Sequence, residues 1–460
     1  MNWQTPAHAL EHNCVFPCIA RYMADPELPS PAKDAAPVAS AVTNPGRASP
    51  DEREDDSNDL GVPDALFAHR PFVLHWSAKV LATLAFRMAS VAIGWQLYAL
   101  TDSAWSLGII GLVQFAPIVP LTLVVGHVAD RCDRRLVVAA CDIVQTLTLL
   151  ALALATAFDR LSPIAIYGAA LIVGCVRAFD QPTMAAMMPR LLPDRLLSRG
   201  IASSSSAGQL ANILGPALGG LLFAQSSVAP YALGALCSLI ALFGMLAIPP
   251  RPPVQSLSRT SLESIFSGLA FIRARPVLLG AISLDMVAVL LGGATALLPI
   301  YARDILQVGP WGLGMLRSAP AVGALGAAFL LSRLPIRKAM GRKMIAAVAV
   351  FGLATMVFAV STSMLLSLAA LAVLGAADNV SVVIRNQLVQ HATPDEMRGR
   401  VFAAFGLFTG TSNQLGEFES GATAAWWGTV PATVVGGVGT VIVALMWSRW
   451  FPDIVKVDRV

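Results

Sequence analysis

The stretch LLPDRLLSRGIASSSSAGQLANILGPALGG at residues 191–220 recurs in altered form as HATPDEMRGRVFAAFGLFTGTSNQLGEFESG at residues 391–421. A shift of 201 residues superposes four pairs: Pro193 on Pro394, Asp194 on Asp395, Gly215 on Gly416 and Gly220 on Gly421. Both copies are surrounded by long apolar stretches. A duplication on this scale indicates two similar helical units, an arrangement typical of transporters that hold a central cavity between two halves.

The composition is that of a membrane protein. Of 460 residues, 56% are apolar and 13% are charged, and the mean hydropathy is +0.66. Twelve helices of about 20 residues would use roughly 240 residues, which accounts for nearly all the apolar ones. This composition excludes a soluble dinucleotide-binding enzyme, a disulfide-stapled secreted module and a nucleic-acid-binding protein. The six cysteines form no disulfide or metal-ligand pattern, so we expect neither a metal nor a cofactor.

The hydrophobic stretches after Pro71 predict an all-α membrane protein with twelve transmembrane helices in two pseudo-symmetric bundles of six. The spans are expected at residues 72–100, 105–127, 136–157, 163–185, 201–224, 230–249, 277–300, 312–331, 344–361, 364–386, 401–427 and 430–450.

The domain organisation follows from these spans. Residues 1–64 are rich in Pro, Ser and acids and carry a net charge of −7, which predicts a disordered cytoplasmic tail. The other expected units are an N-terminal bundle at 65–249, a cytoplasmic linker at 250–276, a C-terminal bundle at 277–451 and a cytoplasmic C-terminal tail at 452–460. Apolar residues at helical spacing within 262–272 predict a short amphipathic helix in the linker, lying on the inner membrane surface.

Basic residues in the loops predict the orientation. If the tail is cytoplasmic, seventeen bases lie in cytoplasmic loops, against Arg160 and Arg303 on the opposite side. The seventeen are Arg131, Arg134, Arg135, Arg190, Arg195, Arg199, Arg251, Arg259, Arg273, Arg275, Arg333, Arg337, Lys338, Arg342, Lys343, Arg398 and Arg400. The positive-inside rule therefore predicts that both termini are cytoplasmic and that anionic lipid contacts this face of the protein.

A charged loop between spans 2 and 3, GHVADRCDRR at residues 126–135, contains Gly126, Asp130, Arg131, Arg134 and Arg135. It resembles the inner-loop motif of the major facilitator superfamily, in which a Gly and an Asp four residues later precede clustered bases. The resemblance implies a conformational latch: Asp130 would lie near the positive N-terminal end of another helix, and the arginines would bind carboxylates or lipid phosphate across the interface. The alternative is a solvated loop that only sets topology.

The segment LGPALGG in span 5 supplies Gly215, Pro216, Gly219 and Gly220. It is similar to the Gly-Pro motif of exporter branches of the same superfamily, which implies a gating hinge. Small residues also let helices approach closely, and proline kinks a span, so a packing role is equally compatible with the sequence.

Four further stretches narrow the resemblance: residues 177–182, 278–306, 377–403 and 410–428. Together they look like the enterobactin-exporter-like branch of the superfamily, also described as transmembrane secretion effectors. The similarity runs from about Pro71 to the C-terminus and does not cover the tail. Arg87 departs from the pattern, because a neutral polar residue is expected at this position in span 1.

Ionisable residues inside the spans are the candidate site, because each costs about 2.5–3.5 kcal/mol at the centre of a bilayer and needs a partner or a wet cavity. They are Arg87, Arg177, Asp180, Asp285, Arg317, Asp378, Arg385, Glu417 and Glu419. Arg177 and Asp180 are three residues apart on one helical face, which favours an ion pair between them. Asp378 and Arg385 also share a face, two turns apart.

Asp285 stands out because its own span offers no base nearby. Burial would favour its neutral form unless a base such as Arg87 approaches, so either a proton carrier or a structural ion pair is expected. Glu417 and Glu419 lie about 200° apart around their helix, so one is expected to line the pathway and the other to bond to a neighbouring helix.

These features predict a secondary transporter of a small amphipathic molecule, siderophore-like or drug-like, that is coupled to proton entry and works by alternating access, and the resemblance implies that it is an exporter. Its expected partners are the substrate, protons and the lipid bilayer; we expect a monomer, no nucleic acid and no enzymatic activity. An importer of the same fold and a membrane sensor or scaffold that does not transport remain alternatives.

Overall fold

A computed structural model describes residues 65–250, 262–334, 336 and 338–457, except positions 119, 122, 123, 126, 127 and 129–131. The predicted tail and the start of the linker lie outside these residues, as do three members of the predicted latch, Gly126, Asp130 and Arg131. The described residues form helices and no strand, as expected of an all-α membrane protein.

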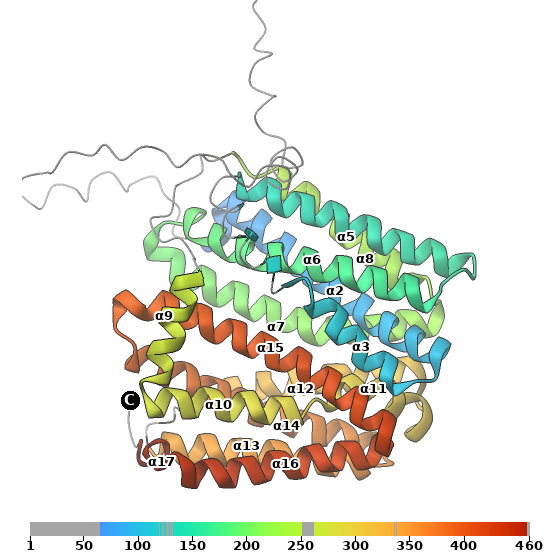
Figure 1. The fold of residues 1–460 in the computed structure, drawn as a ribbon. Coiled ribbons are helices and arrows are strands. Elements are labelled where there is room, and N and C mark those ends of the chain that lie inside the picture. The colour runs from blue at the N-terminus through green and yellow to red at the C-terminus, as the bar shows by residue number, and fades with distance from the viewer. Residues whose placement is uncertain are drawn as a thin grey trace, which may run out of the picture.

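The described residues of the N-terminal half form six helices of twelve or more residues, arranged as Figure 1 shows. They are α2 Arg70–Thr101, α3 Ala104–Phe115, α5 Arg134–Ala157, α6 Pro163–Met187, α7 Asp194–Gln225 and α8 Ala229–Leu246. Two single turns, η3 Leu66–Ala68 and η4 Met188–Arg190, accompany them. Local sequence marks two of the helix starts: the Asp133 side chain accepts a hydrogen bond from the Arg135 backbone N–H, and Ser162 caps α6 ahead of Pro163.

The C-terminal half begins with the linker helix α9 Leu262–Arg273. Its long helices are α10 Pro276–Leu291, α12 Gly309–Arg333, α13 Met340–Val360, α14 Met364–Ala392, α15 Asp395–Trp427 and α16 Thr429–Trp450. Span 7 continues beyond α10 as η5 Ala294–Leu297, α11 Leu298–Ile300 and the π-turn η6 Tyr301–Ile305, and the short helix α17 Pro452–Lys456 follows α16.

Ten of these helical segments are long and apolar enough to cross a bilayer. The shorter α3 and the more polar, 33-residue α15 lie among them (Figure 1). The helices alternate in direction, so the turns after α2, α5, α7, η6, α13 and α15 lie at one end of the bundle, here called the far face. The opposite end carries α9, α17 and the start of α2, and is called the terminal face.

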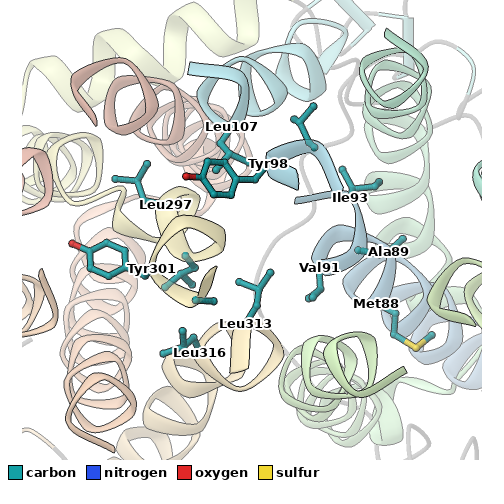
Figure 2. Packing of buried hydrophobic residues seen from close by; sticks show 14 of the residues in the cluster. Met88, Ala89, Val91, Ile93, Tyr98, Leu107, Leu297, Tyr301, Leu313 and Leu316 are labelled. Atoms are coloured by element: carbon teal, nitrogen blue, oxygen red, sulfur yellow. The ribbon is translucent and has the colours of Figure 1, made fainter. Parts of the chain in front are cut away.

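The two halves meet along two pairs of helices, α3 with α15 and α7 with α12. The duplication noted in the sequence relates α7 to α15, so the two pairs are equivalent by pseudo-symmetry. One apolar core joins the halves: Met88 and Val91 of α2 share it with Leu297, Leu313 and other residues of the C-terminal half (Figure 2).

Glycines allow close approach of the halves near the far face. Gly220 of α7 lies against Gly314 of α12, where a Cβ built on Gly220 would be 2.8 Å from the Gly314 Cα. Gly421 of α15, its counterpart in the duplication, lies against Gly108 of α3, where a Cβ on Gly108 would be 3.0 Å from the Gly421 Cα. Any larger residue would push the halves apart, as is usual for small-residue contacts between membrane helices.

The same helices separate toward the terminal face. Gly410 lies on the stripe of α15 that carries Glu417 and Gly421, yet no described atom lies within 4 Å of a Cβ built there. Contacts of α7 with α12 extend to the hydrogen bond from Gln209 Nε2 to the Ala321 carbonyl at 3.3 Å. Gly406, one turn nearer the terminal face on the same stripe of α15, likewise has no described atom within 4 Å of a Cβ built on it. The seam between the halves is therefore closed at the far face and opens toward the terminal face.

The linker helix and the C-terminal segment both pack on the C-terminal half. Ile272 of α9 is buried with Val401 and Phe405 of α15, whereas Phe266 on the other side of α9 is exposed. The predicted linker helix is thus present, and its buried face contacts a neighbouring helix. In the predicted C-terminal tail, Ile454 of α17 is buried against α10 and α13.

Candidate functional site

Four charged side chains from both halves meet at the seam. Glu417 of α15 interacts electrostatically with Arg317 of α12, Arg177 of α6 and Arg87 of α2, most strongly with Arg317. A Cβ built on Gly111 of α3 would lie 2.8 Å from Glu417 Oε2, so this glycine makes room for the carboxylate. We call these four charged residues the central cluster.

Each arginine of the central cluster is held by a neighbour. Arg87 Nε donates to Asn212 Oδ1 of α7 at 2.9 Å, and the Arg177 guanidinium lies 4.1 Å from the Phe86 ring centroid. Arg317 Nη1 donates to the Ser90 carbonyl at 2.8 Å and to Ser90 Oγ at 2.9 Å, which ties α12 to α2 across the seam. All four cluster residues are only partly buried, so each keeps some surface accessible to solvent.

A second charged group lies inside the C-terminal half. Asp285 of α10 forms an ion pair with Arg385 of α14, and the two residues are only 6% and 2% exposed. Asp378, also on α14, lines a small pocket together with Asp285 and Ser381. The Arg385 guanidinium also lies 5.0 Å from the Phe405 ring centroid of α15. Arg385 thus pairs with Asp285, while Asp378 lines the same pocket.

The structure corrects two expectations about partners. Asp285 pairs with Arg385 and not with Arg87, which binds Asn212 instead. Within the described part of the chain, no ion pair within 4.0 Å joins Arg177 to Asp180, because the arginine stacks on Phe86. None joins Asp378 to Arg385 either, although they share a helical face.

The two glutamates of α15 point in different directions, as expected. Glu417 joins the central cluster, whereas Glu419 accepts a hydrogen bond from the hydroxyl of its neighbour Ser420 at 3.5 Å. Glu417 is therefore the glutamate that lies at the seam.

The two basic residues of the predicted latch that the structure describes bind within the N-terminal half. Arg134 Nη1 donates to the Ala186 carbonyl at the end of α6, at 2.8 Å, and Arg135 Nη1 donates to the Ile248 carbonyl beyond α8, at 2.7 Å. Arg135 also pairs with Asp133 at 2.9 Å. A cation at the carbonyl end of a helix is favourable, so these arginines fasten helix ends to one another, whereas contacts across the interface were expected.

The glycines of the predicted hinge form two packing surfaces on α7. A Cβ on Gly215 would lie 2.5 Å from the Arg87 Cβ, and one on Gly219 would lie 2.8 Å from the Met88 Cα. These two glycines face α2, and Gly220 faces α12. Pro216 lies within the continuous helix Asp194–Gln225, and its carbonyl oxygen would be 2.5 Å from a Cβ on Gly314. Close packing is the structural role that these contacts show.

Sequence reasoning missed a polar group in the N-terminal half. Asp142 of α5 is 2% exposed, and its Oδ2 has no hydrogen-bond partner among the described residues. Asp180 interacts electrostatically with Asp142 and with Lys79, and Lys79 Nζ donates to Ser204 Oγ at 3.0 Å. Asp142 and Lys79 are ionisable residues inside apolar spans, the same signal that drew attention to Asp285.

A polar clasp at the far face was also missed. Arg303 Nη1 of η6 pairs with Asp102 Oδ1 at the end of α2 at 2.7 Å, and the Tyr98 hydroxyl donates to Asp304. The Arg303 guanidinium lies 5.3 Å from the Tyr98 ring centroid. The far-face clasp, made of these four residues, joins the two halves where the seam is closed. Its signal in the sequence was two charges next to each other at the end of span 7.

The protein is a duplicated bundle of membrane helices. A charged cluster lies between its two halves, and the halves separate toward one face. This arrangement defines a transporter of the major facilitator type. The chain belongs to the transmembrane secretion effector family of this superfamily, whose sequence profile matches residues 63–458. Members of this family are transporters and not enzymes. The chain is a secondary transporter of a small molecule and a multi-pass protein of the inner membrane.

Relatives agree with this assignment. The chain is 26% identical over 383 residues to the enterobactin exporter EntS of Escherichia coli O1:K1, covering 83% of this chain and 92% of that protein. The EntS proteins of Citrobacter koseri and of Shigella boydii serotype 18 match with the same identity over the same length.

Solved structures share the fold. An inward-facing, unoccupied bacterial homologue of the human lysosomal transporter Spinster superposes with a TM-score of 0.68 at 14% identity, covering 84% of this chain and 98% of that one. An inward-facing bacterial homologue of the iron transporter ferroportin superposes with a TM-score of 0.63 at 17% identity, covering 84% of this chain and 99% of that one.

Proposed function

We propose that the chain exports a small amphipathic molecule, siderophore-like or drug-like, by alternating access coupled to proton entry. The observation that carries this proposal is the central cluster, in which charged residues from both halves meet at a seam that is open at one end only. Rocking of the halves would expose the same four side chains first to one side of the membrane and then to the other.

The basic loops support a cytoplasmic terminal face. The opening of the seam then faces the cytoplasm, where an exporter takes up its substrate. The identity to enterobactin exporters supports the outward direction and suggests a siderophore-like cargo.

We assign proton coupling to Asp285, Asp378 and Arg385. Arg385 pairs with Asp285, whereas Asp378 lines the same buried pocket without an ion pair to Arg385 in the described structure, which favours uptake of a proton by this group. Its link to the substrate site is direct: α10, which carries Asp285, packs on α15, which carries Glu417. Gly416 lies at that contact, where a Cβ would be 2.7 Å from the Val289 carbonyl oxygen.

Export profiling identifies the cargo. A strain that lacks the gene is compared with the wild type for release of a panel of siderophores, enterobactin first, and for resistance to a panel of drugs. We expect the deletion strain to retain one compound that the wild type secretes, and complementation with Asp285→Asn to fail to restore its release.

Direction is tested with that compound in proteoliposomes that carry an imposed proton gradient. An exporter that exchanges substrate for protons accumulates the compound in the acidic compartment. An importer that carries both together moves it out of that compartment, and a sensor or scaffold moves nothing. Either of the last two results contradicts the proposed function.

A further inference from the structure

The central cluster carries more positive than negative charge. Three guanidinium groups, of Arg87, Arg177 and Arg317, interact electrostatically with the single carboxylate of Glu417. Asp180 interacts with both Arg177 and Lys79, and Glu419 bonds to Ser420. The remaining neighbours that bind the cluster, Asn212 and Ser90, are neutral. The four residues of the central cluster therefore carry a formal charge of +2.

Hydrogen-bond capacity points the same way. Each guanidinium has five N–H donors, whereas one carboxylate offers about four acceptor positions. Protein partners take the Nε of Arg87 and the Nη1 of Arg317. Arg177 stacks on Phe86 and makes no hydrogen bond to a described residue, and its guanidinium nitrogens are not among the fully buried atoms. Donors that face solvent remain when Glu417 is satisfied.

We infer that the central cluster binds an anionic group of the transported molecule, such as a carboxylate, phenolate or phosphate, with Glu417 as the counter-ion that this group displaces. Planar guanidinium groups bind such anions with paired, charge-assisted hydrogen bonds. Phe86, which lies beneath Arg177 and 5.6 Å from Arg87, together with Phe418 and Trp105 nearby on α15 and α3, supplies aromatic surface for the apolar body of the molecule.

This inference rests on the proposed transport through the central cluster, but on neither its direction nor its coupling ion. It has an energetic consequence for export. An anion that leaves a cell with a negative interior moves in the direction that the membrane potential favours. The potential then assists the proton gradient for such a substrate and opposes it for a cation.

Three probes with one ring system and different charges test the inference: 1-naphthoate, 1-naphthamide and 1-naphthylmethylammonium. Their binding to the purified full-length protein in lipid nanodiscs is measured by titration calorimetry. We expect the carboxylate to bind roughly tenfold to hundredfold more tightly than the amide, since a hydrogen bond to a charged group has that effect, and the ammonium to bind most weakly.

Two variants make the test specific. Arg177→Gln should abolish the preference for the carboxylate while leaving the affinity for the amide within a few-fold. Glu417→Gln should raise the affinity for the carboxylate several-fold, a gain that a misfolded protein cannot produce. Glu396→Gln is the control, because it removes a charge from an exposed residue on the helix that carries Glu417, and it should change the affinity for neither the carboxylate nor the amide.

The inference is overturned if the carboxylate does not bind more tightly than the amide, or if neither probe binds. It is also overturned if the Arg177→Gln variant still prefers the carboxylate. Flux measurements separate this failure from failure of the proposed function. Gradient-driven export of a neutral or cationic compound without carboxylate preference would overturn the inference alone. Carboxylate binding without any gradient-driven flux would overturn the proposed function alone.

Discussion

At the scale of single residues, the charges inside the spans could be found in the sequence, but their partners could not. Asp285 and Glu417 were recognised because a charge in an apolar span is costly. Asp285 pairs with Arg385, which lies a hundred positions away, and Glu417 faces arginines from three other helices. Such pairs depend on how helices rotate and pack, which a single sequence does not reveal.

The ion pair of Asp285 with Arg385 gives the first prediction. Asp285→Asn leaves a buried arginine without its counter-charge, which is expected to cost about 3–5 kcal/mol of stability. The melting temperature of the purified protein in detergent should fall clearly. The double variant Asp285→Asn/Arg385→Gln should recover much of the loss, and Glu396→Gln should have no effect. Equal melting of the single and double variants would show that the pair does not hold α10 to α14.

The far-face clasp gives a contrasting prediction. Arg303 and Asp102 are substantially exposed, with side-chain exposures of 37% and 71%, so their ion pair should contribute less than about 1 kcal/mol. Arg303→Ala should therefore change the ratio of molecules with an open far face to molecules with a closed far face by less than fivefold. Spin-label distances between Asp159→Cys and Thr362→Cys, both exposed on the far face, measure that balance in a background without native cysteines. A fully open far face in this variant would contradict the estimate.

At the scale of elements, glycines set how closely helices of the two halves approach. The duplication superposed Gly220 on Gly421, and both make contact with a glycine of the opposite half. The spacing of the glycines in α7 was visible in the sequence, and close packing was considered there beside a gating hinge. What the sequence could not show was their partners, Gly314 and Gly108, because helix pairing across the seam is a property of the assembled bundle.

Gly314→Leu tests this role. The added side chain cannot fit between α12 and α7, where even a Cβ would be 3.0 Å from the Gly220 Cα. We expect the far face to open in most molecules, seen as a longer distance between the labels at positions 159 and 362. Gly326→Leu, on the same helix but with no described atom within 4 Å, is the matched control and should leave the distance unchanged. An unchanged distance in Gly314→Leu would mean that the contact does not close the seam.

At the scale of the whole molecule, the sequence predicted the fold well. Most helices begin and end within a few residues of the predicted spans, because long apolar runs have few alternatives to a membrane helix. Span 11 departs from this pattern. Its helix α15 carries Glu417 and Glu419 and begins six residues earlier than expected. Its polarity follows from its position at the seam, where it faces charged residues of the other half.

Orientation is a property of the whole chain and has its own test. Single cysteines at Ser198 on the terminal face and Asp159 on the far face, in a background without native cysteines, are treated with a membrane-impermeant maleimide in intact spheroplasts. The excess of basic residues in the terminal-face loops predicts labelling at position 159 and protection at position 198 until the membrane is broken. The reverse pattern would place the opening of the seam outside the cell.

Alternating access around the central cluster is tested most directly by measuring two distances in one preparation. Spin labels at positions 159 and 362 report on the far face, and labels at Ser198→Cys and His391→Cys, both exposed, report on the terminal face. Under conditions that drive turnover, the far-face distance should lengthen as the terminal-face distance shortens, while Glu417 and its arginines stay between them. Distances that never change, or that change together, would contradict the account and favour a membrane protein that does not transport.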